Sequence, residues 1–398
     1  MGAEATPGKP PVDGELIVEL TERMVAIPTR NPPGDERPCA EFVHETLAGW
    51  GLETELIPEP YPERPQVVAW VRGSGDGPTV VLNGHLDVVG EGDPEAWTHP
   101  PFRVTRDGDR LYGRGTADMK GAVAGGMAVC KALHEAGTPF AGTLMLQAVI
   151  GEEMDEDGTR TLLRKGYVGD HAIVMEPTDA RIGPGTRGAC WHRIRLSGPS
   201  VHCGLAAPDA PDVMRFVAHF ASAIAAHHDH VSAREHHLLP NPACRISRIA
   251  GGDTHNATVR CCELTVDRRM LPDEGYEDVT AELRELLAAT ARAVPGVEHE
   301  LEFLAGNEPT ETALDTPLIR ALQANFRQVF GREAEIWGPP YGSDMRNFVA
   351  DCGIPTTNFG AGDFSVCHQP DEWVSASDLV RCAQTVLGTA VDLLGPGR

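Results

Sequence analysis

Apolar positions in the first half of the chain alternate between two patterns, one typical of helices and one typical of buried strands. Helical spacing over residues 15–27 ends before Pro28, and a second helical stretch over 39–50 is closed by Gly51. Further helices are predicted over 121–136 and 159–165, and continuous apolar runs predict strands over 52–57, 66–72, 78–82, 143–150 and 171–175. Helices alternating with such strands indicate a mostly parallel sheet covered by helices on both faces.

The pattern changes after Gly183-Pro184-Gly185, where polar and apolar residues begin to alternate. Strands are predicted over 189–197, 243–250, 258–267 and 299–304, and helices over 211–228 and 276–292. Helices over 317–329, 343–351 and 376–394 and a strand over 355–359 then return the chain to its first pattern. We predict an α/β fold in which residues 1–187 and 306–398 form a mostly parallel sheet flanked by helices. Residues 188–305 form an inserted smaller α+β domain, with an antiparallel sheet and two helices.

Composition and charge exclude several classes of protein. A chain of 398 residues with 41% hydrophobic residues can fill two cores, and it has no apolar run long enough to span a membrane. The formal net charge of −24 argues against nucleic acid or an anionic membrane as a partner and leaves a small molecule as the expected ligand. The ten cysteines lack C-x-x-C spacing, and no secretory signal is recognisable, so we expect reduced thiols in the cytoplasm.

Acidic residues and histidines gather where the predicted parallel strands end. These residues are His85, Asp87, Glu152, Glu153 and Glu176, and two more candidates, Asp118 and His368, lie in a glycine-punctuated turn and a late loop. Ligands bind outside the carboxyl ends of parallel strands, so these side chains are expected to converge. Each residue also has an ordinary structural explanation: Asp118 could cap the helix that follows it, and Glu152-Glu153 could be a solvated turn. Repetition at several strand ends favours a shared metal site.

Two histidines and three carboxylates suit zinc, with cobalt or manganese as alternatives at the same site. Five protein ligands are too many for one tetrahedral ion, but they suit two divalent ions that share a bridging carboxylate. Within the adjacent pair, one of Glu152 and Glu153 can bind metal while the other takes a proton from a water whose pKa the metal lowers. Asp87, two residues after His85 on the same strand face, is placed to orient the second imidazole nitrogen.

The motifs GHLDVV, GRGTADMKG, the Glu-Glu pair, MEPT and CHQPDE resemble those of the di-zinc amidohydrolase and exopeptidase family. This family includes acetylornithine deacetylase, succinyl-diaminopimelate desuccinylase, aminoacylase and a glutamate-releasing carboxypeptidase. The resemblance implies that His85 and Glu176 bind one ion, Glu153 and His368 bind the other, and Asp118 bridges them. It also implies Glu152 as the general base, Asp87 behind His85, and a di-metal catalytic role for the larger domain.

The inserted domain carries the motif GPSVHCG, which contains His202. The resemblance implies that this domain is a lid and dimerisation domain, and that His202 stabilises the oxyanion in the active site of the neighbouring protomer of a homodimer. The family usually has a hydroxyl residue where this chain has Cys203. Substrate contacts are implied for Arg187, Asn256, Arg269, Gly342 and Ser343, although the arginines could equally form ordinary salt bridges.

We therefore expect a metal-dependent hydrolase that cleaves the amide bond of an N-acyl amino acid or related N-acyl amine by metal-bound hydroxide. Glu at position 176, where related peptidases tend to have Asp, favours a deacylase. The alternatives are a dipeptidase or carboxypeptidase of the same family, a non-catalytic binding protein on this fold, and a purely structural zinc site. A structural site requires closed four-ligand coordination and predicts no effect of Glu152→Ala on turnover.

Overall fold

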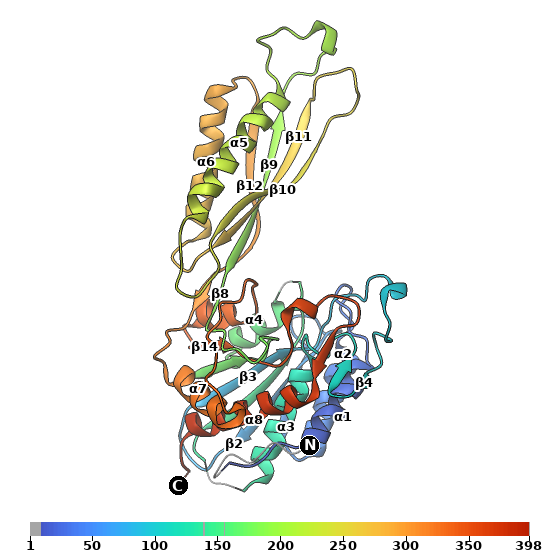
Figure 1. Ribbon diagram of the computed structural model, residues 1–398, viewed down its shortest axis with the longest axis vertical. Coiled ribbons are helices and arrows are strands. Elements are labelled where there is room, and N and C mark those ends of the chain that lie inside the picture. The colour runs from blue at the N-terminus through green and yellow to red at the C-terminus, as the bar shows by residue number, and fades with distance from the viewer. Residues whose placement is uncertain (1–8, 138–139, 155, 398) are drawn as a thin grey trace. The chain divides into compact units, whose positions relative to one another are not determined.

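The computed structural model describes residues 9–137, 140–154 and 156–397, which form two compact units. Unit 1 contains the described residues up to Gly185 together with Thr312–Trp337 and the described residues from Ser343 onward, and unit 2 contains Thr186–Glu311 and Gly338–Gly342. The sequence predicts boundaries at 187/188 and 305/306, and the main divisions between the two units lie at 185/186 and 311/312. The short segment Gly338–Gly342 packs with unit 2, whereas the sequence pattern assigned it to the larger domain. Figure 1 labels the helices and strands of both units.

Unit 1 is built on a six-stranded sheet that is parallel at its centre. In spatial order its strands are β1 (Glu53–Ile57), β2 (Gln66–Arg72), β6 (Thr143–Val149), β3 (Thr79–His85), β7 (His171–Val174) and β14 (Thr356–Asn358). The pairs β6–β3, β3–β7 and β7–β14 are parallel, and β1–β2 and β2–β6 are antiparallel. The carboxyl ends of β6, β3 and β7 therefore lie next to one another at one edge of the sheet.

Helices cover both faces of this sheet. Along β3, Val80 and Leu82 belong to the larger core cluster, whereas Val81 belongs to a cluster on the opposite face, so successive side chains are buried on opposite sides. The larger cluster includes residues of α1 (Gly14–Val25), α2 (Arg37–Gly49), α3 (Lys120–Glu135), α7 (Pro317–Phe330) and α8 (Ala376–Leu394). The opposite cluster includes residues of α4 (Asp157–Arg164) and of η3 (Asn347–Asp351). Burial on both faces explains the continuous apolar runs.

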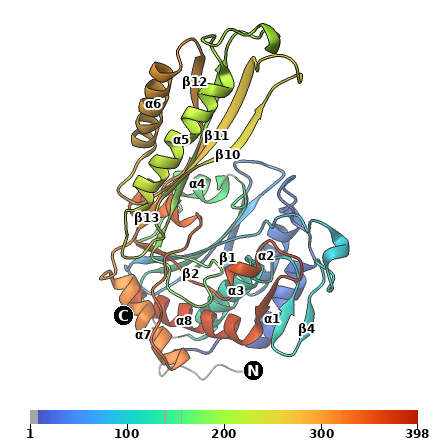
Figure 2. The ribbon, with the colours of Figure 1, turned by 45° about the horizontal axis from the view of Figure 1, so that its top comes forward.

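Unit 2 has a four-stranded antiparallel sheet with two helices on one face (Figure 2). Its strands, in spatial order, are β10 (Ala243–Gly251), β11 (Cys261–Met270), β9 (Gly188–Ser197) and β12 (Glu298–Asn307), and its helices are α5 (Val213–Ser232) and α6 (Tyr276–Ala293). Burial alternates strictly along β11, because one side chain in two packs under the helices. The chain enters and leaves through β8 (Gly185–Thr186) and β13 (Thr310–Glu311), which pair with each other, as expected for an inserted domain.

The fold class predicted from the sequence is confirmed, but some elements differ in extent. β3 continues through Gly84 to His85, whereas the apolar run predicted an end at residue 82. The helix predicted over 343–351 is a short π-helical segment, η3. A small sheet of β4 (Thr105–Asp107), β5 (Arg110–Tyr112) and β15 (Trp373–Ser375) was not predicted. Among the described residues, no helix has both the length and the apolar character needed to cross a membrane.

Candidate metal centre

The strand-end residues of unit 1 come together at the carboxyl edge of its sheet. His85 is the last residue of β3, Glu152 and Glu153 follow β6, and Glu176 follows β7. Two more residues arrive from outside the sheet: Asp118 in the turn before α3, and His368 shortly after the 3₁₀ turn η4 (Phe364–Val366). Because β6, β3 and β7 are adjacent and parallel, the topology itself gathers these side chains.

The side chain of Asp118 lies between the two histidines. Its Oδ1 is 3.0 Å from His85 Nε2, and its Oδ2 is 3.2 Å from His368 Nε2. Glu153 Oε2 is also 3.0 Å from His368 Nε2. The possible ligand atoms form two groups, each with all its atoms within 4.8 Å of one another: His85, Asp118 and Glu176, and Asp118, Glu153 and His368. The two groups share Asp118, which is the arrangement that a pair of ions with a bridging carboxylate requires.

Glu152 belongs to neither group, although it precedes Glu153 directly. Its Oε2 lies 3.8 Å from His85 Nε2, within reach of the same space but beyond hydrogen-bond distance. The adjacent carboxylates therefore point to different positions. This geometry leaves Glu152 available for proton transfer beside the ligand groups.

The tautomer of His85 suits a metal ligand. Its Nδ1 lies 2.9 Å from the backbone carbonyl oxygen of Asp87, which can only accept, so Nδ1 carries a proton and the neutral ring has its lone pair on Nε2, where a metal ion would bind. The Asp87 carboxylate is farther from this nitrogen, at 3.7 Å. It instead accepts hydrogen bonds from the backbone N–H groups of Glu152 (3.3 Å) and Glu153 (3.2 Å) and from Asn31 Nδ2 (2.9 Å). Asp87 thus holds the turn that carries both glutamates.

The cluster places several carboxyl groups close together in a buried environment, which favours the binding of cations. Burial raises the pKa of Glu176 and Glu152 well above the usual range, and neighbouring carboxylates raise both further. Glu176 Oε1 is a buried oxygen without a hydrogen-bond partner among the described residues. Burial alone would lower the pKa of His85, but its hydrogen bond to Asp118 and the surrounding negative charge outweigh burial and raise it. Buried carboxylate oxygens and imidazole nitrogens that have too few hydrogen-bond partners are suitable ligands for divalent metal ions.

We expect the metal-free protein to lose stability as pH rises from about 5 to about 9. Burial raises the pKa of Glu152, Glu153 and Glu176, and hydrogen bonds to Asp118 and Glu153 raise that of His368 to about 10. The native state therefore holds more protons than the unfolded chain across this range, and stability falls with pH wherever that is true. The lowered pKa of Asp118 acts in the opposite sense only below about pH 4.

Thermal unfolding of chelator-treated protein at a series of pH values measures this effect. Saturation with zinc should flatten the dependence, because bound cations favour the ionised carboxylates and the neutral imidazoles. A melting temperature of the metal-free protein that rises steadily with pH over the same window would contradict the charge distribution described above.

The candidate residues of unit 2 form two separate pairs. His202 and Asn256 lie together, because Ala257 bridges to His202 and the N–H of Cys203 donates to the Asn256 carbonyl (2.9 Å). Arg187 and Arg269 are also neighbours: Arg187 immediately precedes β9, and Arg269 pairs with Ala189 in the adjacent strand. Arg187 Nη1 donates to the Asn241 carbonyl, and Arg269 forms a bidentate ion pair with Asp267 (2.8 and 3.0 Å). The two pairs lie at opposite ends of the ten-residue strand β9.

The last two substrate candidates are held by internal contacts. Gly342 packs against Asn307, whose side-chain nitrogen would lie 2.7 Å from an added Cβ. Ser343 is fully buried, and its hydroxyl donates to Asn358 Oδ1 (2.9 Å). The Ser343 side chain therefore makes a structural contact within unit 1.

A third group of possible metal ligands lies in unit 2, at His236, His237 and Glu311. His236 Nδ1 accepts hydrogen bonds from the backbone N–H groups of Leu238 (3.2 Å) and Leu239 (3.1 Å), so the neutral ring carries its proton on Nε2. That nitrogen lies 3.3 Å from Glu311 Oε2 and can donate to it. Because Nε2 lacks a free lone pair, this group is a hydrogen-bonded cluster and a poor metal site.

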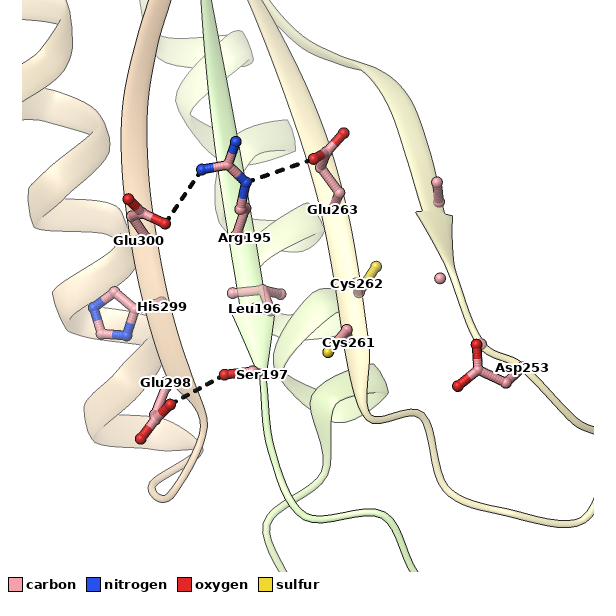
Figure 3. Close-up of a pocket in the computed structure, with 13 residues that line it drawn as sticks. Arg195, Leu196, Ser197, Asp253, Cys261, Cys262, Glu263, Glu298, His299 and Glu300 are labelled. Carbon is pink, nitrogen blue, oxygen red and sulfur yellow. Dashed lines mark hydrogen bonds and ion pairs between the residues drawn. The ribbon is translucent and has the colours of Figure 1, made fainter.

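The open face of the unit 2 sheet carries a hollow of about 710 Å³ (Figure 3). Among its lining residues, Arg195 lies between Glu300 (3.3 Å) and Glu263 (3.8 Å), and Ser197 donates to Glu298 (3.1 Å). The guanidinium is thus neutralised on both sides, and the only hydroxyl among the lining residues, that of Ser197, already donates to a carboxylate. The cluster in unit 1 is the better candidate for chemistry.

Several residues around the metal centre were not singled out from the sequence. Glu372, Arg114 and Lys120 are fully or almost fully buried, and the Lys120 ammonium donates to the carbonyls of Met24 and Ile27. Asn31 supports Asp87 as described above. Glu372 is the last residue of the quoted CHQPDE motif, but its partners are the Arg114 side chain and backbone N–H groups of the same distant segment, which a single sequence does not reveal.

Comparison with known proteins gives matches along nearly the whole chain. The model of peptidase family M20/M25/M40 matches residues 81–392. An N-formyl-4-amino-5-aminomethyl-2-methylpyrimidine deformylase from Halalkalibacterium halodurans is 27% identical over 402 residues, covering 94% of this chain and 93% of the relative. An acetylornithine deacetylase from Edwardsiella ictaluri is 30% identical over 354 residues, covering 84% and 86%.

Solved structures share the fold. Aminopeptidase PepT from Bacillus cereus superimposes with a TM-score of 0.78 at 18% identity, covering 96% of this chain and 99% of that one. A dinuclear metal-binding peptidase of the M20 family from Bacillus subtilis gives a TM-score of 0.74 at 16% identity, covering 96% and 97%. These structures confirm the fold, whereas the match to the family model over residues 81–392 confirms the family resemblance found in the sequence and implies divalent metal ions.

Proposed function

Because the chain belongs to the peptidase family M20/M25/M40, we propose that it is a two-metal hydrolase of the amide bond in an N-acyl amino acid or related N-acyl amine. The observation that carries this proposal is the pair of ligand groups that share Asp118. His85 and Glu176 would complete one ion site, and Glu153 and His368 the other. Zinc suits these donors, and cobalt or manganese are alternatives. Unit 1 would then be the catalytic domain.

The roles of the protein's own groups follow from their positions. Bound divalent ions would polarise the amide carbonyl and lower the pKa of water. Glu152, outside both ligand groups, takes the proton of the attacking water as the new C–O bond forms. It returns that proton to the amine nitrogen as the C–N bond breaks. Asp87 keeps the Glu152 backbone in place throughout, through its hydrogen bond to the Glu152 N–H.

The choice of an acyl amine over a peptide draws on two observations. Position 176 is Glu, and the curated relatives described above are named for the removal of formyl and acetyl groups from amines. A dipeptidase or carboxypeptidase remains the alternative within the family. A panel of N-formyl, N-acetyl and N-succinyl amines and amino acids, assayed against dipeptides after metal addition, decides between them. Faster turnover of dipeptides than of every acylated compound would refute deacylation.

We also propose that the protein acts as a homodimer through unit 2, with His202 stabilising the oxyanion in the partner's site. The separation of the two candidate pairs within unit 2 supports this. His202 and Asn256 lie beyond one end of β9 and Arg187 beyond the other, a span of roughly 30 Å for ten extended residues. One small substrate cannot reach both ends in a single copy of unit 2. A second copy would supply the missing pair.

Mixing two inactive variants tests the shared site. Glu152→Ala and His202→Ala should each be inactive, but a mixed dimer contains one site with both residues intact. After subunit exchange we expect recovery of about a quarter of wild-type activity, because half of the dimers are mixed and each has one working site. No recovery, with subunit exchange verified by differently tagged chains, would show that His202 acts within its own protomer, and full activity of His202→Ala alone would show that it has no role.

A further inference from the structure

The carboxylate of Glu372 is enclosed by hydrogen-bond donors from the segment that carries Asp118. Its Oε1 accepts from the backbone N–H groups of residues 115, 117 and 118, at 2.8, 3.0 and 3.2 Å. Its Oε2 accepts from Arg114 Nη1 at 2.6 Å. The side chain is fully buried, so water does not compete for these bonds. Glu372 lies only four residues after His368 in the sequence.

Both carboxylate oxygens are required by this arrangement. Glutamine has nearly the same shape, but its NH₂ group would face either three backbone N–H groups or the Arg114 guanidinium. In either orientation a donor meets a donor, and buried groups lose their partners. Arg114 cannot move away freely, because it is itself buried and packs over the ring of Trp97 at 5.2 Å.

The hydrogen bonds of Glu372 continue those between strands β5 and β15. Strands β5 and β15 pair Tyr112 with Trp373, and the N–H of Gly113 donates to the Glu372 carbonyl (2.8 Å). Beyond Gly113 the Glu372 side chain continues the connection as far as the N–H of Asp118. The segment holding Asp118 and the segment holding His368 are thus joined next to the point where Asp118 Oδ2 and His368 Nε2 approach to 3.2 Å.

We propose that Glu372 is a positioning residue that fixes the spacing between Asp118 and His368 and thereby controls retention of the second metal ion. This inference rests on the two-metal function proposed above. The first ion would depend less on Glu372, because its two ligands besides Asp118 are His85, the last residue of β3, and Glu176, which follows β7. His368 lies in a loop with 44% of its side chain exposed, and its position depends on such links.

Titration of metal-depleted protein with cobalt(II), followed by visible absorption, tests this role directly. The wild type should bind two equivalents. Glu372→Gln should bind the first with an affinity within about threefold of wild type and the second about 10–100-fold more weakly. Excess metal should restore kcat, because Glu372 belongs to neither ligand group. If Glu372→Gln does not fold, Glu372→Asp keeps both oxygens on a shorter side chain and should weaken only the second equivalent.

The matched control is Glu274→Gln in unit 2. Glu274 also accepts from a buried guanidinium, that of Arg268, and from a backbone N–H, that of Leu271 (2.8 Å). It should lower the melting temperature and leave both cobalt equivalents in place. Unchanged binding of the second equivalent by Glu372→Gln, beside a wild type that binds two, would overturn the positioning role alone. A wild type that binds fewer than two equivalents would overturn the proposed function and this inference together.

Discussion

Replacement of Glu152 by glutamine is expected to lower kcat by about 10³-fold while two metal ions stay bound. The side chain lies outside both ligand groups, with its Oε2 3.8 Å from His85 Nε2, so the change removes a proton acceptor and no metal ligand. Glutamine preserves the size of the side chain, and the Asp87 carboxylate still accepts the backbone N–H at position 152. Steady-state kinetics and metal analysis of the purified variant measure the two quantities separately.

The neighbouring glutamate provides the matched control. Glu153 Oε2 lies 3.0 Å from His368 Nε2, so Glu153→Gln should lose one of the two ions and recover part of its activity when metal is added in excess. Opposite behaviour of the two variants, metal loss at 152 and pure loss of turnover at 153, would reverse the assignment of base and ligand. Retained turnover in Glu152→Gln would leave a structural zinc site as the better explanation.

Substitution of Asp118 by asparagine should remove both ions and lower kcat/KM by at least about 10³-fold. Each oxygen of Asp118 faces a different histidine, and asparagine offers only one oxygen and no charge. The remaining carboxylates would then have to hold the ions without the shared ligand. Metal analysis after gel filtration, at protein concentrations in the micromolar range, gives the stoichiometry.

Asp344→Asn controls for the loss of a buried acid near this site. Asp344 is buried in unit 1 and belongs to neither ligand group, and burial raises its pKa to about 7, so the fold already accommodates its neutral form. This variant should keep both ions. Two ions bound to Asp118→Asn with near-normal affinity would exclude Asp118 as the bridge.

Much of the fold could be predicted because its central strands are buried on both faces, which leaves continuous apolar runs. The sequence predicts that β3 ends at residue 82, because the following Asn83-Gly84 resembles a turn, but the strand continues to His85. In the structure an added Cβ at Gly84 would lie 2.9 Å from the side chain of Val123 and 3.0 Å from that of Met119. Glycine is needed there so that α3 can pack closely against the strand. The small sheet of β4, β5 and β15 has strands of three residues, too short to show a period.

Site residues could be predicted where they lie at the ends of strands. A residue whose side chain binds the backbone of a distant segment could not. His85, the two glutamates and Glu176 were found because parallel strands deliver them to one edge. Three of the four N–H groups that Glu372 binds belong to the backbone, which any residue type would provide, and nothing in the sequence pairs Arg114 with Glu372. The Asp87 carboxylate was expected beside His85, yet it lies closer to the backbone of Glu152 and Glu153.

The order of synthesis matters for a sheet whose sixth strand, β14, is translated only after all of unit 2. Its partner β7 must wait with one edge unpaired while the insertion emerges from the ribosome and folds by itself. Pairing between strands so far apart in the sequence is slow, and until it occurs the unpaired edge of β7 can pair with other chains and aggregate. We therefore expect the yield of active protein to depend on expression temperature and chaperone supply more than that of uninterrupted α/β domains of similar size.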